Sequence, residues 1–363
     1  MKKLSIGLLA WGITAVLLAG CGSGQEGGGG DTKPVQSVGQ SADSSAAAPE
    51  TSQETAQSGG SLVVYSPNVD EIMNTLIPMF ENETGIKVEV VSAGAGELMK
   101  RIESEKENPY ADVIFGGYVT DADYFEEYVS VNLPDLLVDQ ENTEPFRTPY
   151  IANGSCLLVN ENLAGEIPIN GYADLLNPDL KGKIVSGDPV SSSSAYRQLT
   201  NILLAMGGYE SEEAWDYVDK LVQNLDGKIL NSSGAVHKGV VEGEYVVALT
   251  YEDPCANYVK SGAPVRIVFP EEGAVFLESD IGIVKGAPNQ ENARKFVDFI
   301  TSKEAQSIFG TELTNRPLHK EAEIGDHLIP YSEINLLTED VEYCQEHKAE
   351  ILDRWKDIII NYE

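Results

Sequence analysis

The sequence is poor in cysteine, histidine and basic residues. Its 363 residues include four cysteines and four histidines, and 25 lysines and arginines stand against 58 aspartates and glutamates. The formal net charge of −33 argues against a nucleic-acid partner, because phosphate backbones are bound by basic surfaces. The net charge does not fix the sign of a small ligand, since the local field of a cleft can oppose it.

The few cysteines match neither a disulfide framework nor a zinc site. Apart from Cys21, they are Cys156, Cys255 and Cys344, an odd number spread widely along the chain. The sequence has no Cys-x-x-Cys motif and no histidine-rich spacing. We expect these three cysteines to be buried as small apolar side chains, and we expect neither a metal nor a cofactor.

Enzyme motifs are also missing. The stretch SAGAGELMK, residues 92–100, imitates a dinucleotide-binding fingerprint but lacks its third glycine. No phosphate-binding GxxxxGK[ST] loop, GxSxG elbow or HExxH helix is present. The sequence therefore favours a binding protein over an enzyme.

The first twenty residues have the features of an export signal. Two lysines precede an apolar run from Leu4 to Leu18, which is too short for a stable membrane span. The run ends in LAGC, which resembles the bacterial lipobox, a signal whose cysteine is lipidated and becomes the mature N-terminus. We expect a signal peptide over residues 1–20, a lipid on Cys21 and a location on the outer face of the cell membrane.

Residues 21–60 are rich in Gly, Ser, Gln and Ala and contain almost no large apolar side chain. Such a segment cannot bury enough surface to offset its ordering entropy. It is expected to be a flexible tether, with a mean reach of roughly 35 Å for about forty residues. The body, residues 61–363, is long for a single core, which favours two lobes.

The body begins with alternating strands and helices. Three apolar stretches predict strands, SLVVYSPN, IKVEVVSAG and ADVIFGG, and the segments between them, 69–85 and 95–109, have the composition of helices. This order predicts parallel strands with right-handed crossovers. Ligands of such sheets bind beyond the carboxyl ends of the strands.

A second α/β unit follows a long strand predicted at 150–160. Its predicted strands are 182–189, 227–230 and 245–253, and its predicted helices are 195–208, 211–225 and a short one within 231–244. Residues 264–287 are expected to return to the first unit, and 289–310 and 338–360 to form amphipathic helices. Two units joined by two extended crossings describe a hinged clamp.

A resemblance to a known family rests on long blocks, among them LVVYSPN, SGDPVSSSSAY, NSSGAVHKGVVEGEYVVALTYED and NARKFVDFITSKEAQ. These blocks resemble the substrate-binding proteins of bacterial ABC importers, in the branch named for ferric iron, phosphonate and hexose-phosphate uptake. The resemblance covers residue 61 to about Pro317.

The resemblance implies a two-lobe, periplasmic-binding-protein-like type II fold of the α/β class. Each lobe is expected to be a mostly parallel sheet flanked by helices, with two crossover strands joining the lobes. We predict lobe 1 over residues 61–155 and 272–335, and lobe 2 over residues 156–271 and 336–363. The implied partners of the monomer are a small anionic solute, a permease and its ATPase subunits.

Turns rich in hydrogen-bond donors are predicted at the cleft. Ser193 or Ser194 is expected to cap the helix that follows the serine run. Helix starts of this kind favour anions because their N–H groups are unpaired and carry partial positive charge. The candidate donors are Ser66, Asn68, Gly94, Ala95, Gly96, Gly117, Ser192, Ser193, Ser194, Ser232, Ser233, Gly234 and Ala235.

Beside these donors, Tyr251, Glu252 and Asp253 end a predicted strand. A strand end does not need a carboxylate as a helix start does, so we expect Glu252 and Asp253 to hold an ammonium group or sugar hydroxyls. Donor turns on one side and carboxylates on the other suit an anion with a polar tail. The predicted solute is a small phosphorylated or phosphonate compound.

Two alternatives stay open. Ferric iron would take an oxygen site from Tyr65, Tyr196, Tyr251 and Glu252. However, iron-binding members of the family use adjacent tyrosines in the second lobe, and this sequence has no such pair; of its histidines, only His237 lies near a predicted site loop. The second alternative is a sensor that presents its bound ligand to a histidine kinase.

Overall fold

The computed structural model describes residues 60–138 and 143–362. The predicted signal peptide, the predicted lipidation site Cys21 and all but the last residue of the predicted tether lie outside the described residues. Within the described part of the chain, no helix is long and apolar enough to cross a membrane.

The first lobe is built on the predicted β-α-β-α-β unit, which is confirmed. Strands β1 (Ser61–Ser66), β2 (Lys87–Ser92) and β3 (Val113–Phe115) are parallel, with helices α1 (Asp70–Thr84) and α2 (Ala95–Glu105) between them. The apolar residues of α1 recur at helical spacing, so Leu76 and Phe80 are fully buried against β1. Gly85, in the left-handed conformation, ends α1.

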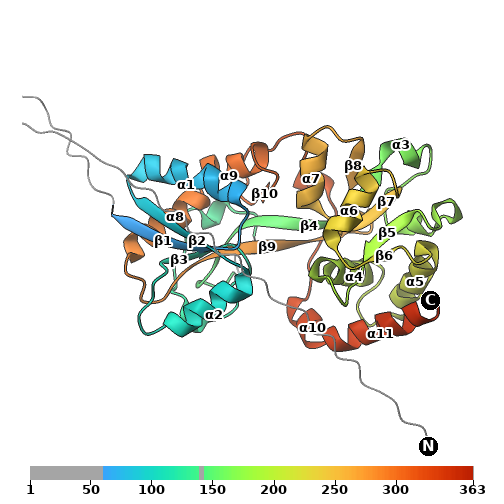
Figure 1. Cartoon of the computed structure of the whole chain (residues 1–363), viewed down its shortest axis with the longest axis horizontal. Helices are drawn as coiled ribbons and strands as arrows, with labels where there is room; N and C mark the ends of the chain where they lie inside the picture. The colour runs from blue at the N-terminus through green and yellow to red at the C-terminus, as the bar shows by residue number, and fades with distance from the viewer. Residues whose placement is uncertain (1–59, 139–142, 363) are drawn as a thin grey trace, which may run out of the picture. The chain divides into compact units, whose positions relative to one another are not determined.

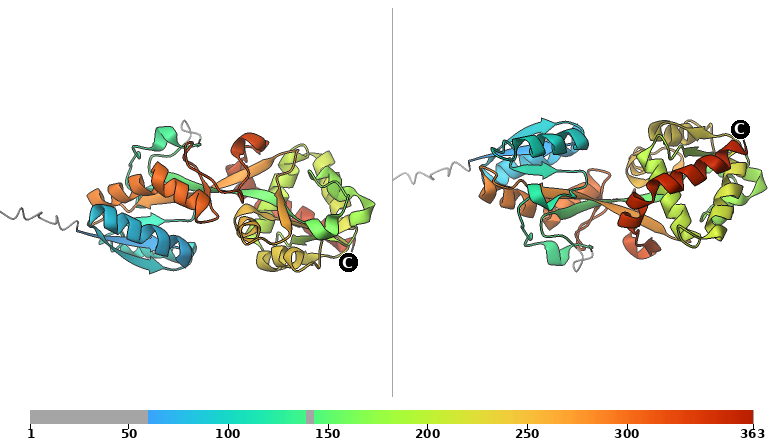
Figure 2. Two further views of the ribbon diagram at one scale, coloured as in Figure 1. Left: turned by 90° about the horizontal axis from the view of Figure 1, so that it is seen from above. Right: turned by 90° about the horizontal axis from the view of Figure 1, so that it is seen from below.

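Two long antiparallel strands join the lobes, as predicted. Strand β4 (Thr148–Asn160) and strand β9 (Ala274–Ile283) pair with each other through the centre of the molecule (Figures 1 and 2). Toward the first lobe, β9 pairs with β3 and β4 pairs with β10 (Arg316–Pro317). Toward the second lobe, β4 pairs with β7 (Val247–Tyr251) and β8 (Val265–Val268). The main sheet therefore has the order β2-β1-β3-β9-β4-β7-β5-β6.

The segment predicted to return as one stretch, residues 264–287, is divided. Its first part is β8, an edge strand on β4, and only its second part is the crossing strand β9. Gly273 lies in the turn between them with a φ of +128°, a conformation that favours glycine.

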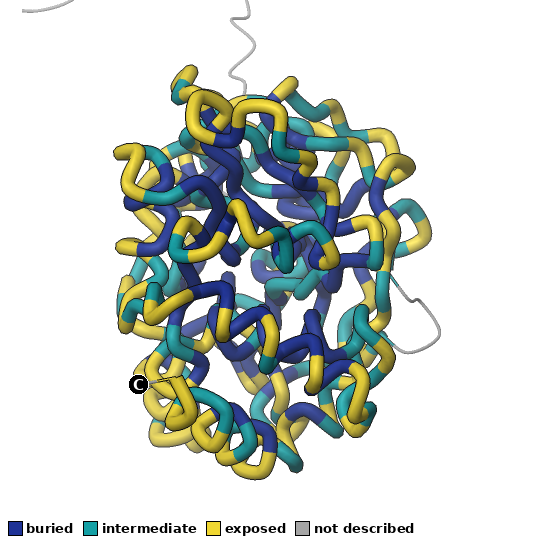
Figure 3. The backbone as a smooth tube through the Cα atoms, turned by 90° about the vertical axis from the view of Figure 1, so that its right-hand side faces the viewer, coloured by how far each residue is buried: buried dark blue, intermediate teal, exposed yellow. Residues whose placement is uncertain are grey.

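The second lobe repeats the α/β pattern. Strands β5 (Ile184–Gly187) and β6 (Ile229–Leu230) are parallel to β7. The helices that pack around them are α3 (Glu161–Ala164), α4 (Ser193–Ala205), α5 (Glu212–Leu225), α6 (Ser233–Val241) and α7 (Glu252–Lys260). The core of this lobe contains Trp215 and Leu221 of α5. Buried segments lie mainly in the interior of the molecule and exposed segments mainly on its outside (Figure 3).

The remaining helices follow β9. Helices α8 (Gln290–Ile300) and α9 (Lys303–Thr311) cover the first lobe, and α10 (Val341–Glu346) and α11 (Lys348–Ile360) lie against the second (Figure 1). Strand β11 (Leu336–Leu337) pairs with β9. Short 3-10 helices lie at Ala122–Tyr124, Leu133–Asp135, Ala173–Leu176, Pro178–Leu180 and Tyr331–Glu333. The three body cysteines are buried, as predicted.

Candidate functional site

The serine run forms the start of helix α4, directly after β5. Ser192 is the cap, one residue earlier than predicted: the backbone N–H of Ala195 donates to its Oγ at 3.3 Å. The backbone N–H groups of Ser191 and Ser192 both donate to the carbonyl of Asp188, which ends the turn at Ser192. Ser193 and Ser194 are therefore the first two residues of the helix.

A second serine turn starts helix α6, after β6. Ser232 is its cap residue, but the Ser232 side chain accepts no capping hydrogen bond. Within the described residues, the backbone N–H groups of Ser193, Ser194, Ser233 and Gly234 have no acceptor. Each helix start thus presents unpaired donors at the positive end of its dipole.

The two serine turns converge on one cleft with a volume of about 690 Å³. Among the described residues that line it, none is a carboxylate and the only cation is Arg197. The hydroxyl and amide donors outnumber the apolar side chains. The lining residues are Asn153, Ser155, Ser191, Ser192, Ser193, Ser194, Arg197, Asn231, Ser232, Ser233, Tyr251 and Leu277.

Tyr251 is half-buried at the edge of this cleft. Burial raises the pKa of its hydroxyl, against a smaller opposing effect of a hydrogen bond with Ser233. The ring of His237 lies edge-on to the Tyr251 ring, with 6.2 Å between centroids. Burial lowers the pKa of His237, and its Nδ1 has no hydrogen-bond partner within the described residues.

Glu252 and Asp253, which were expected to contact the ligand, are not among the residues that line this cleft. Glu252 is the first residue of α7, not a free strand end, and its carboxylate is paired with Arg316: Nε donates to Oε2 at 2.8 Å and Nη2 donates to Oε1 at 2.5 Å. Asp253 Oδ1 accepts from Thr314 Oγ1 at 3.0 Å and from Asn315 Nδ2 at 3.2 Å. Burial raises the pKa of both carboxyls, and the hydrogen bonds from Arg316 and Thr314 oppose only part of this rise. A buried carboxylate needs hydrogen-bonding partners, and those of Glu252 and Asp253 hold both side chains away from the cleft.

The first-lobe turns lie side by side at the carboxyl ends of β1, β2 and β3. Ser66 Oγ and Asn68 Nδ2 both donate to the carbonyl of Phe115, at 2.6 and 3.0 Å, and so tie β1 to β3. A Cβ added to Gly117, whose φ is +82°, would lie 3.2 Å from Cβ of Ala95. These turns, with Gly94 and Gly96, are not among the residues that line the 690 Å³ cleft. Nor are Gly234 and Ala235, which lie further along α6.

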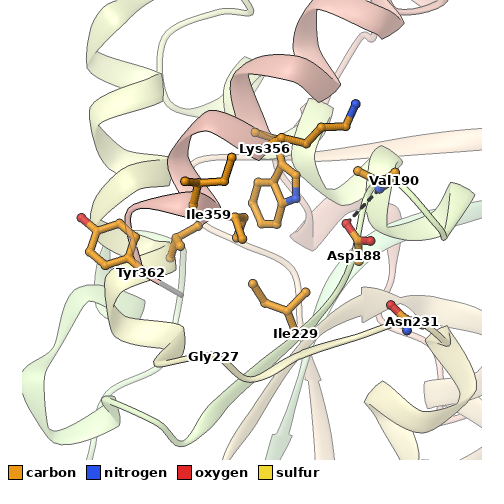
Figure 4. Close-up of a pocket in the computed structure, with 11 residues that line it drawn as sticks. Asp188, Val190, Gly227, Ile229, Asn231, Lys356, Ile359 and Tyr362 are labelled. Atoms are coloured by element: carbon orange, nitrogen blue, oxygen red, sulfur yellow. Dashed lines mark hydrogen bonds between the residues drawn. The ribbon is translucent and has the colours of Figure 1, made fainter. Parts of the chain in front are cut away.

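A separate hollow of about 770 Å³ lies between α11 and the β6 region (Figure 4). Ile229, Ile359 and Tyr362 face it, and the Val190 N–H donates to Asp188 at 3.0 Å at its edge. Its walls are mainly apolar, and it contains none of the predicted site residues.

Residues 62–311 match the model of a family described as bacterial extracellular solute-binding protein. The chain belongs to this family. It is a solute-binding protein of the ABC importer type, and the predicted family and fold are confirmed.

Known relatives of this solute-binding protein differ in the ligand that their names give. Iron uptake protein A1 of Synechocystis sp. is 28% identical over 269 residues, which cover 68% of this chain and 72% of that protein. A Salmonella typhi protein with the provisional name of a 2-aminoethylphosphonate-binding periplasmic protein is 27% identical over 238 residues, covering 63% and 68%. The solved structure of the periplasmic binding protein AfuA from Actinobacillus pleuropneumoniae, with fructose-6-phosphate bound, has 26% identity and a TM-score of 0.65, covering 83% of this chain and 98% of that one.

The four residues of the iron alternative are not brought together in this solute-binding protein. The Tyr65 hydroxyl donates to Glu105 at 2.8 Å, inside the first lobe. The Tyr196 hydroxyl donates to the carbonyl of Cys344, and burial raises its pKa to about 12. Of the four, only Tyr251 lines the serine cleft. The described residues also contain no group of three His, Cys, Asp or Glu side chains that could hold a metal ion.

Several lining residues were not predicted from the sequence. Asn153 and Ser155 alternate along β4, and Asn153 pairs with Leu277 of β9, so all three lie on one face of the crossing ribbon. Arg197 follows Ser193 by one helical turn. Alternation along β4 and helical spacing from the serine run are the signals that point to these residues.

Proposed function

We propose that this solute-binding protein captures a small phosphorylated or phosphonate anion outside the cytoplasm and delivers it to the permease of an ABC importer. We also propose that a lipid on Cys21 holds it at the outer face of the membrane. The observation that carries the choice of solute is the composition of the cleft: two helix starts, hydroxyl donors and one guanidinium, with no carboxylate among the described lining residues.

The charges of the cleft favour an anion although the chain as a whole has a net charge of −33. Each helix start contributes roughly 0.3–1 kcal/mol to binding a negative charge, and up to about 2 kcal/mol where the site is partly buried. Hydrogen bonds to a charged oxygen add roughly 1.5–3 kcal/mol each. A phosphoryl or phosphonate group has three oxygens that can accept from several of these donors at once.

Two of the relatives support a phosphorus-containing solute, and one supports the iron alternative. Fructose-6-phosphate in AfuA and the phosphonate in the Salmonella name share the PO₃ group. Iron is named for the Synechocystis relative. Iron(III) prefers charged oxygen ligands, and among the described residues the cleft offers only the Tyr251 phenol, whose pKa burial raises.

We further propose that closure of the lobes completes the site. In this proposal the turns at Asn68, Gly96 and Gly117 approach the serine turns, as the predicted lobe boundaries 61–155 with 272–335 and 156–271 with 336–363 imply. Hinged closure around a ligand is the usual motion of two-lobe binding proteins.

A thermal-shift screen tests the proposal. The panel contains fructose-6-phosphate, inorganic phosphate, 2-aminoethylphosphonate, ferric citrate and thiamine. A ligand at 100 times its dissociation constant stabilises the protein by about 2.7 kcal/mol. We expect stabilisation by phosphorus compounds, reduced when Ser193 and Ser233 are both replaced by Ala. Stabilisation by ferric citrate alone, with a visible phenolate band lost in Tyr251→Phe, would show that the solute class is wrong.

A further inference from the structure

Arg197 enters the serine cleft from the second turn of α4. It lies four residues after Ser193, so both side chains leave the helix on the same face. Its side chain is 31% exposed, and it is the one cation among the described residues that line the cleft.

Only one edge of the Arg197 guanidinium is occupied. Nη1 donates to Glu339 Oε2, whereas Nε and Nη2 have no partner within the described residues. A guanidinium has five N–H donors in a planar fork, which suits two-point recognition of a phosphoryl or carboxyl group. The unoccupied edge therefore leaves donors for a ligand in the cleft.

Glu339 is held firmly in place. Its side chain is 2% exposed, and its Oε1 accepts from Thr200 Oγ1 at 2.7 Å. Both oxygens are thus engaged by residues of α4. Glu339 precedes α10, and the carbonyl of Cys344 within α10 accepts from the Tyr196 hydroxyl. Residues 339–344 therefore hold the first turns of α4.

We propose that Arg197 binds the anionic group of the solute through its unoccupied edge, and that Glu339 positions it. This inference rests on the proposed function and names the residue that supplies the positive charge. Glu339 keeps the guanidinium oriented and neutralises it while the cleft is empty. The serine hydroxyls and helix starts then surround the anion, and Arg197 supplies its counter-charge.

The test is calorimetry on the full protein with inorganic phosphate and fructose-6-phosphate, with fructose as the uncharged control. Arg197→Gln is expected to weaken binding of both anions at least about tenfold, as the loss of a charged hydrogen bond implies. Arg197→Lys should recover part of the loss, since it restores charge without the fork. Glu339→Gln removes one negative charge but retains an acceptor for Arg197, so it should tighten anion binding.

Lys181→Gln is the matched control, because it removes one positive charge from the same lobe at an exposed pair with Asp226. It should leave both affinities unchanged. Phosphate binding in Arg197→Gln equal to that in Lys181→Gln overturns the role of Arg197 but not the proposed function. Anion binding that is unchanged or weaker in Glu339→Gln overturns the claim that Glu339 neutralises Arg197 while the cleft is empty. Absence of binding by the wild type to both anions overturns this inference, and the thermal-shift panel with 2-aminoethylphosphonate then decides the proposed function separately.

Discussion

Replacing Arg316 by Met is expected to destabilise the protein strongly. The Arg316 and Glu252 side chains are 1% and 2% exposed and share two hydrogen bonds. The guanidinium also lies 4.6 Å from the ring centroid of Tyr331 and 5.2 Å from that of Phe276. Removing one partner leaves Glu252 as an uncompensated buried charge, which costs about 3–5 kcal/mol. That is a large fraction of the roughly 5–15 kcal/mol that stabilises a typical domain.

The measurement is urea unfolding followed by circular dichroism. The double variant Arg316→Met, Glu252→Met removes both charges and fills the space with apolar atoms, so it should recover most of the lost free energy. Lys181→Met is the control for loss of an ion pair at the surface. Its pair with Asp226 has a 3.6 Å separation, and both side chains are more than half exposed, so little change is expected.

The pair joins two segments that lie far apart in the sequence. Glu252 begins α7 of the second lobe, whereas Arg316 belongs to β10, which pairs with β4 next to α9. An Arg316→Met variant as stable as Lys181→Met would refute the reasoning, because the buried carboxylate would then be protonated or hydrated at no cost. A double variant less stable than either single variant would show that the pair contributes net stability.

Three further outcomes are expected. Burial lowers the pKa of His237 in the folded protein below its ordinary value of 6.5, so the unfolded chain takes up a proton at a higher pH than the folded one. The free energy of unfolding should therefore fall as the pH drops from 6.5 through the folded pKa. His237→Phe should show a smaller fall in unfolding experiments between pH 7 and 5. Gly117→Ala should lower the free energy of unfolding by about 1–2 kcal/mol because Gly117 has a positive φ. A Cβ added at Gly96 meets no atom within 4 Å, so Gly96→Ala should leave the stability unchanged or raise it slightly. Equal melting temperatures of the two variants would contradict this. Cys21→Ser should release the protein from the membrane or leave it unprocessed, and unchanged membrane retention with the same mature mass would exclude lipidation.

Local patterns in the sequence predicted the fold because its elements are strongly periodic. The alternation of strands and helices in residues 61–117 and the helix after the serine run follow directly from composition and spacing. The division of residues 264–287 was missed, because the apolar runs on either side of Gly273 have the same character. Both runs pair with β4, and β9 is the one that crosses because it also pairs with β3 of the first lobe, which is a long-range contact.

The candidate site was predicted in part for the same reason. The turns at Ser192 and Ser232 are local features, and the structure brings them to one cleft. The partner of Glu252 is Arg316, 64 residues further along the chain, so the sequence could not show that this carboxylate is already paired. Arg197 lies on the face of α4 that follows Ser193, and only the fold shows that this face lines the cleft.

The junction of β7 and α7 connects the serine cleft to residues 314–316 through consecutive residues. Tyr251 lines the cleft, and the next two residues are bound to Thr314, Asn315 and Arg316 of the opposite segment. The Glu252–Arg316 bonds are buried and the Asp253 bonds are partly buried, so under the proposed function a shift of Tyr251 on ligand binding would be passed on to residues 314–316. The same junction explains why the two carboxylates that follow Tyr251 do not line the cleft. They anchor the strand end, and the cleft is left with donors for an anion.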